Sequence, residues 1–244
     1  MNVTLDPRLT GFGGAAHGGY VMTLALRAMA AAVDDPERTP RSLTMHLLAP
    51  IGPGDVEIDA RLERAGGSMS SASARVAQGG ATVATALAAF GRARPSLAQQ
   101  DATMPDVPSP DELAPLVDVP VPESEMDVER RPARGPLPLT GGDRPELAAW
   151  MRMASDEPVD VYRATHLADA LAPALYGALD EYVAMPSTEI ALHYAPDTRS
   201  DSPWVLAVVR NRFAGDGYAL EDGELWTPDG RLLLRSRQMR RILG

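Results

Sequence analysis

Two stretches of sequence decide the fold: SLTMHLLAP at residues 42–50 and STEIALHYAP at residues 187–196. Each is typical of a β-strand that ends in Ala-Pro, and each comes after a stretch with the apolar spacing of a helix. The same order of elements therefore occurs twice within 244 residues. This repeat predicts a duplicated α+β unit in which one helix is followed by antiparallel strands.

The elements around these stretches follow from periodicity and turn residues. In the first half, His17-Gly18-Gly19 opens a helix at 20–33, and strands are expected at 42–50, 55–64, 69–77 and 81–90. In the second half, we expect a helix at 167–179 and strands at 187–194, 204–213, 218–226 and 231–242. Each half alone would leave unpaired sheet edges. We therefore predict a pseudo-dimer, with the two sheets joined edge to edge and the helices buried.

Proline marks the boundary between the halves. Residues 95–143 hold ten of the 22 prolines, together with many acidic residues and no sustained apolar periodicity. Such a composition is typical of an extended connector. The expected division is a first unit at 1–94, a connector at 95–143 and a second unit at 144–244.

Composition excludes several kinds of chemistry. The chain has no cysteine, and all 23 of its basic residues are arginine. Schiff-base enzymes, P-loop lysines and thiol nucleophiles are therefore excluded. A net charge of −10 argues against nucleic acid as a partner. With no signal peptide, membrane span or metal-ligand spacing in the sequence, we expect a cytoplasmic protein without a membrane partner, metal or cofactor.

The order and spacing of six segments resemble one known family. In the first half they are HGGYVMTLALRAM, SLTMHLLAPIGPGDVEI and RAGGSMSSASARVAQ, and in the second they are HLADALAPALY, STEIALHYAP and DGRLLLRSRQM. Together they resemble the double-hot-dog acyl-CoA thioesterases of the thioesterase II type, over nearly the whole chain except the connector. The resemblance implies a tandem hot-dog fold, in which each half wraps an antiparallel sheet around one central helix.

The resemblance also implies an activity and a site. That family hydrolyses acyl-CoA with water activated by an Asp, a Ser or Thr, and a Gln from the second half. On this sequence the Asp is Asp169 and the Gln is Gln238, while the hydroxyl is Ser187 or Thr188, with Ser187 slightly favoured. Asp169 is expected at the opening of the second helix, where backbone N–H groups favour a developing oxyanion. No cofactor is implied.

Each candidate also has a purely structural interpretation. Asp169 is equally typical of a helix cap. Gln238 has a stronger internal argument, because strand alternation places it on one face with Leu232, Leu234 and Ser236, where its amide needs partners. In the first half, His17 falls opposite Asp169 and Ala88 falls opposite Gln238. We therefore expect one catalytic site per chain, with the first half as pocket wall.

Substrate contacts are expected in two places. His17, Gly18 and Gly19 stand at a helix start, where glycine permits close approach of a ligand. Arg235 and Arg237 are candidates for holding the CoA phosphates, although a solvated strand face is an equally good interpretation. The alternatives to the thioesterase are a non-catalytic hot-dog protein that binds an acyl or other apolar ligand, and a dehydratase using His17. A homo-oligomer of such chains is possible.

Overall fold

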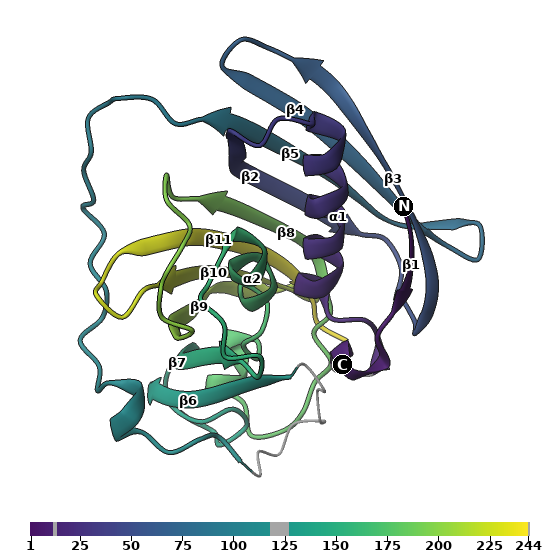
Figure 1. Cartoon of the computed structure of the whole chain (residues 1–244). Coiled ribbons are helices and arrows are strands. Elements are labelled where there is room, and N and C mark those ends of the chain that lie inside the picture. Colours follow the sequence, from purple (N-terminus) through teal and green to yellow (C-terminus); the bar gives the residue numbers. More distant parts are fainter. Residues whose placement is uncertain (12–13, 118–126, 244) are drawn as a thin grey trace.

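The computed structural model describes residues 1–11, 14–117 and 127–243, and within them one antiparallel sheet of eleven strands runs through the molecule (Figure 1). The first half contributes β1 (Asn2–Leu5), β2 (Arg38–Leu47), β3 (Gly54–Ala65), β4 (Met69–Gln78) and β5 (Ala81–Arg92). The second half contributes β6 (Val128–Arg134), β7 (Glu146–Met153), β8 (Ser187–Tyr194), β9 (Val205–Gly215), β10 (Tyr218–Trp226) and β11 (Leu232–Arg241). Their order is β1-β3-β4-β5-β2-β8-β11-β10-β9-β7-β6.

The long helix α1 (Gly18–Val33) covers the sheet of the first half (Figure 1). Its residues at helical spacing, among them Val21, Ala25 and Met29, are buried against β3, β4 and β5. It begins after His17 and ends at Asp34, which adopts the left-handed conformation with φ 51°. The helix expected at 20–33 is therefore confirmed, with a start two residues earlier.

The second helix differs from the expectation. α2 (Val161–Leu167) ends where the predicted helix at 167–179 was to begin, so that prediction is wrong. Asp160 caps α2, its Oδ1 accepting a hydrogen bond from the Arg163 N–H at 2.8 Å. The chain then leaves the helix, and Pro173 precedes only the short 3₁₀ turn Ala174–Gly177. Asp169 consequently follows a helix C-terminus instead of opening a helix.

The two halves are joined by the pairing of β2 with β8. Ser42 lies opposite His193 and His46 lies opposite Glu189, in an antiparallel register. The side chains of Leu43 and Leu192 are buried in the same core at this junction. The prediction of a pseudo-dimer whose sheets join edge to edge is confirmed.

The region between the halves contains more structure than its composition indicated. β6 lies inside the expected connector, and β1 and β7 were also missed. Connector residues that come before β6 in the chain pack on an apolar cluster that includes Trp150. The Trp150 Nε1–H donates a hydrogen bond to the Pro108 carbonyl at 2.9 Å. Residues 118–126 of the expected connector, including Pro120 and Pro122, lie outside the described residues. In the described part of the chain, no helix has the length and apolar character needed to cross a membrane.

Candidate active site

Asp169 faces the start of α1. The backbone N–H of Gly19 acts on the Asp169 carboxylate and opposes the rise of its pKa that burial causes. The approach is so close that a Cβ added to Gly18 would lie 2.5 Å from Asp169 Oδ2. A helix N-terminus therefore does stand beside this carboxylate, as expected, but it belongs to α1 of the first half and not to the second helix. The missing side chain of Gly18 makes the arrangement possible.

Ser187 and Gln238 form a hydrogen-bonded pair beside Asp169. Gln238 is 1% exposed and lies on the inward face of β11. The Ser187 hydroxyl donates to Gln238 Oε1 at 3.0 Å. Because the amide oxygen is used in this way, the amide nitrogen is the group left to act on the Asp169 carboxylate, whose pKa Gln238 lowers. Of the four candidate residues, two of which were alternatives for one hydroxyl, the structure thus brings three together: Asp169, Gln238 and Ser187.

The fourth, Thr188, is turned away from this pair. Its hydroxyl donates to the backbone carbonyl of Met239 at 3.0 Å. The register of β8 on β11 shifts between Met239 and Arg240, so Ser187 pairs with Arg240, which lies on the same face of β11 as Gln238. Of the two alternatives left open by the sequence, the geometry favours Ser187.

Two buried charged residues that the sequence analysis missed lie beside this pair. Arg240 is 6% exposed and Glu221 is 2% exposed. Arg240 Nη2 lies 3.0 Å from Glu221 Oε1 and 3.7 Å from Asp169 Oδ1. Strand alternation was a signal for Arg240, which stands two residues after Gln238. Glu221 lies directly opposite Gln238 on β10, a pairing that requires knowledge of the register.

The first half supplies a histidine that contacts the candidate base. His17 Nε2 lies 2.9 Å from the Asp169 carbonyl oxygen, so this nitrogen carries the proton and donates. Its Nδ1 is buried without a hydrogen-bond partner among the described residues. The His17 ring also lies 4.9 Å, centroid to centroid, from that of His166 on α2. The first half therefore contributes contacts to the candidate catalytic groups, and the expectation that it forms only a wall is too narrow.

Burial controls the protonation of these groups. It lowers the pKa of His17 to about 4 and that of His166 to about 3, so both imidazoles are neutral at neutral pH. Burial also raises the pKa of the Asp169 carboxyl, against the opposing influence of Arg240 and of hydrogen bonds from Gln238 and Gly19. A carboxylate with a raised pKa is a stronger base, which suits proton abstraction from water.

Arg235 and Arg237 are not near this cluster. Alternation along β11 places their exposed side chains on the face opposite to Gln238. Arg235 lies 3.4 Å from Glu224, and Arg237 lies 2.9 Å from Asp222. Each guanidinium already has a carboxylate partner, so contact with CoA phosphates stays a prediction without support from the geometry.

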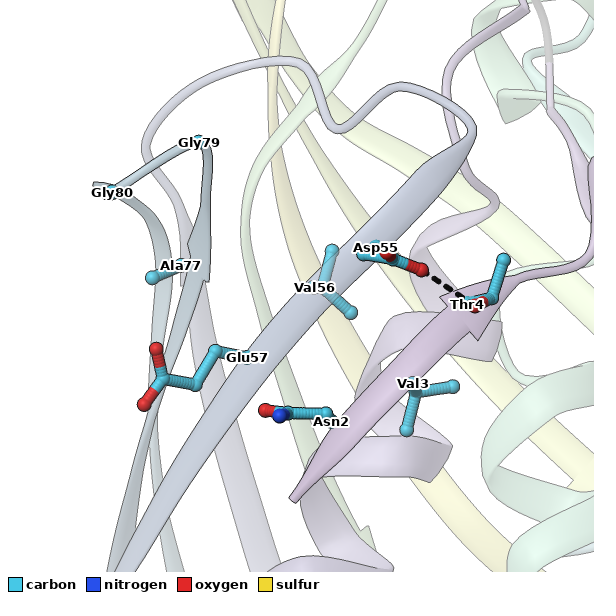
Figure 2. Close-up of a pocket in the computed structure, with 9 residues that line it drawn as sticks. All are labelled: Asn2, Val3, Thr4, Asp55, Val56, Glu57, Ala77, Gly79 and Gly80. Atoms are coloured by element: carbon cyan, nitrogen blue, oxygen red, sulfur yellow. Dashed lines mark hydrogen bonds between the residues drawn. The ribbon is translucent and has the colours of Figure 1, made fainter.

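A pocket elsewhere is unrelated to these residues. Figure 2 shows it between β1, β3 and the turn after β4, with the Thr4 hydroxyl donating to Asp55 Oδ1 at 2.5 Å. None of its nine lining residues belongs to the Asp169 cluster; they are Asn2, Val3, Thr4, Asp55, Val56, Glu57, Ala77, Gly79 and Gly80. Across the residues described, no three His, Asp or Glu side chains are grouped so as to hold a metal ion.

A helix packed on each half of one continuous sheet, with the candidate site between the halves, defines a double-hot-dog protein. The sequence matches two family models: the acyl-CoA thioesterase N-terminal domain over residues 5–91 and the acyl-CoA thioesterase C-terminal domain over residues 97–242. The chain belongs to the acyl-CoA thioesterase family. No protein with curated annotation matches the sequence.

Solved structures share the fold over the whole chain. A hot-dog protein of unknown function from Alicyclobacillus acidocaldarius is 26% identical, with a TM-score of 0.89, covering 100% of this chain and 92% of that chain. The tesB protein of Mycobacterium avium subsp. paratuberculosis is 18% identical, with a TM-score of 0.81 and coverage of 100% and 92%. The acyl-CoA thioesterase II TesB2 of Mycobacterium marinum is 21% identical, with a TM-score of 0.74 and coverage of 99% and 91%. These likenesses support the double hot-dog fold.

Proposed function

We propose that this chain hydrolyses acyl-CoA thioesters to the free acid and CoA, using water activated by Asp169, Gln238 and Ser187. The observation that carries the proposal is the gathering of Asp169 and the hydrogen-bonded pair of Ser187 and Gln238 at the start of α1. Membership of the acyl-CoA thioesterase family supports a thioester hydrolase and implies the acyl-CoA substrate.

The chemistry needs a base, an orienting group and a stabiliser of negative charge. Asp169 takes a proton from water as the water oxygen adds to the thioester carbonyl. Gln238 has a second amide hydrogen besides the one directed at Asp169, and this hydrogen is available to the water or to the carbonyl oxygen. The backbone N–H groups of the first turn of α1 favour the developing oxyanion. Collapse of the intermediate breaks the C–S bond, and the CoA sulfur leaves as the thiolate and takes up a proton.

Ser187 serves this chemistry by fixing the amide. A carboxamide can flip, exchanging its oxygen for its nitrogen, and the flip would direct an acceptor at the Asp169 carboxylate. The hydroxyl that donates to Gln238 Oε1 opposes this flip. In this role Ser187 does not attack the substrate, which agrees with hydrolysis by water.

The direct test is thiol release from a panel of acyl-CoAs by the parent protein and by Asp169→Asn. We expect turnover in the variant to fall by about 100-fold or more, because the base is lost while the shape is kept. The matched control is Asp201→Asn, an exposed aspartate of the second half, which should retain parental turnover. A parent protein that binds acyl-CoA without releasing thiol would instead establish the non-catalytic binding protein.

A further inference from the structure

Arg240 and Glu221 form a buried ion pair to which the hydrolysis above assigns no task. Arg240 Nε lies 3.3 Å and Arg240 Nη2 lies 3.0 Å from Glu221 Oε1. The second oxygen of Glu221 accepts a hydrogen bond from the backbone N–H of Ala174. Burying two charges is expensive, and a buried pair is by itself weak evidence for stability. The location of the pair beside the candidate base therefore calls for another explanation.

The other contacts of Arg240 close a ring around the site. Arg240 Nη1 donates to Ser187 Oγ at 3.0 Å. Ser187 donates to Gln238 Oε1, the Gln238 amide acts on the Asp169 carboxylate, and Asp169 Oδ1 lies 3.7 Å from Arg240 Nη2. Arg240 thus contacts Ser187 at one end of the proposed catalytic chain and Asp169 at the other, which closes the ring.

Donors and acceptors in the ring are fixed by Arg240, which can only donate, and by the Asp169 carboxylate, which can only accept. A guanidinium has only donors, so Ser187 Oγ must be the acceptor in its contact with Arg240. The Ser187 hydrogen is then free to point at Gln238 Oε1, and the amide nitrogen is left to face Asp169. Without Arg240 the hydroxyl can rotate to another acceptor and the order is lost.

We propose that Arg240 is a positioning residue of this site, which orients the Ser187 hydroxyl and holds the Asp169 carboxyl in its ionised form, and that Glu221 limits the strength of this effect. The inference rests on the proposed function, in which Asp169 is the base. It differs from a purely structural role for the ion pair because it predicts changes of opposite sign at Asp169 when the two partners are removed.

The other groups around Asp169 leave Arg240 as the dominant charge. From α1 come His17 and the Gly19 N–H, and from α2 comes His166; both imidazoles are neutral at neutral pH because burial lowers their pKa. β6 brings Arg130, whose Nε donates to the Ala170 carbonyl at 2.9 Å and whose charge acts on both histidines. β10 brings Glu221, whose carboxylate is bound to Arg240.

The test is a titration that does not depend on turnover. In protein carrying ¹³C-labelled aspartate, the Asp169 carboxyl resonance is assigned from its loss in Asp169→Asn, and its pKa is measured in each variant. Arg240→Gln should raise the Asp169 pKa by about 1 to 3 pH units, because an adjacent cation favours the charged form. Glu221→Gln should lower it, because Arg240 is then free to act on Asp169 alone. Arg241→Gln, the exposed neighbour on the same strand, should leave it unchanged.

Kinetics give the second readout. The acid limb of kcat/KM should move to higher pH in Arg240→Gln and to lower pH in Glu221→Gln, and kcat should fall with little change in KM. Arg240→Lys keeps the charge without the planar fork, so its Asp169 pKa should stay closer to that of the parent while its kcat still falls. The inference is overturned if the Asp169 pKa is unchanged in Arg240→Gln, or if it shifts in the same direction in Arg240→Gln and Glu221→Gln.

The test still gives an answer if the single variants do not fold or if the parent protein has no thioesterase activity. Removing one partner of a buried pair is strongly destabilising, whereas replacing both by apolar residues is often tolerated. If the single variants do not fold, Arg240→Met combined with Glu221→Leu should still show an Asp169 pKa above that of the parent; an unchanged value contradicts the role of Arg240. A parent protein that releases no thiol would refute the proposed function. The titration would still test whether Arg240 and Glu221 control the pKa of Asp169.

Discussion

Gly18 lies where the first turn of α1 meets Asp169 of the second half. Its missing Cβ leaves the space occupied by Asp169 Oδ2, which is the end of a short side chain and can move. Gly18→Ala should therefore displace the carboxylate more than it disturbs the fold. We expect turnover to fall by about 100-fold, the scale for a small misplacement of a catalytic group, with folding retained in circular dichroism.

The matched control for this change is Gly67→Ala. A Cβ at Gly67 meets no atom within 4 Å. Its backbone is also outside the positive-φ region. This variant should keep parental turnover. Equal activity of both variants would contradict the close approach of α1 to Asp169.

The choice between Ser187 and Thr188 can be measured directly. Ser187→Ala removes the donor to Gln238 Oε1 and should lower kcat by about 10-fold, through loss of the amide orientation. Thr188→Val removes only a bond to the Met239 carbonyl, so it should cost about 1 kcal/mol of unfolding free energy and change kcat far less. The reverse order of the two kcat values would assign the hydroxyl to Thr188.

At the scale of elements, α1 and α2 meet through neutral, buried histidines. Burial lowers the pKa of His166 to about 3, while the unfolded chain has the ordinary value near 6.5. Between these values the unfolded state binds a proton that the native state does not, so stability declines as the pH falls from 6.5. One such group contributes about 1.4 kcal/mol per pH unit within this window.

His166→Phe should remove this contribution, because a phenyl ring cannot titrate and His166 Nε2 has no partner to lose among the described residues. Urea unfolding at pH 6, 5 and 4 should show a slope with pH reduced by about 1 kcal/mol per unit relative to the parent. Asp169 contributes with the opposite sign in both proteins and cancels in the comparison. Leu87→Ala, which changes an exposed and non-titrating side chain of β5, should keep the parental slope.

Elements with a strong local signal were predictable from the sequence. β8 and β10 begin and end at the expected residues, because a proline or a glycine turn bounds each alternating run. The prediction of a helix at 167–179 was wrong. The apolar spacing continues past Pro173, although the chain leaves the helix after Leu167. β6 was missed because its residues, VERRPAR, have no apolar alternation; its formation depends on pairing with β7.

Part of the candidate site could be predicted from the sequence. Alternation placed Gln238 on the buried face, and resemblance supplied Asp169 and Ser187. The contacts of Asp169 with Gly19 and His17 could not be predicted, since they join residues about 150 positions apart across two helices. The same holds for Glu221, whose place opposite Gln238 depends on the register of β10 on β11, which shifts between Leu225 and Trp226.

At the scale of the whole molecule, the β2–β8 junction makes the two halves one cooperative unit. All three tryptophans, at 150, 204 and 226, belong to the second half. Leu43 of the first half is fully buried at the junction, and Leu43→Ala should cost about 2–5 kcal/mol. We expect the tryptophan fluorescence transition in urea to shift together with the circular dichroism transition.

Leu87→Ala is the control for this experiment, because Leu87 belongs to the same half but is exposed on β5. It should leave both transitions in place. If Leu43→Ala shifted only the circular dichroism signal and left the fluorescence of the second half unchanged, the halves would unfold independently.

The difference between the two helix starts has a genetic consequence. α1 begins at Gly18, where the absent Cβ admits Asp169, whereas α2 begins after Asp160, which caps its own helix. In a symmetric assembly of two identical subunits, every codon change appears at both helix starts at once. A gene that encodes both halves in tandem can alter one copy and keep the other. The covalent link thus permits an asymmetric site that the symmetry of a homodimer would forbid.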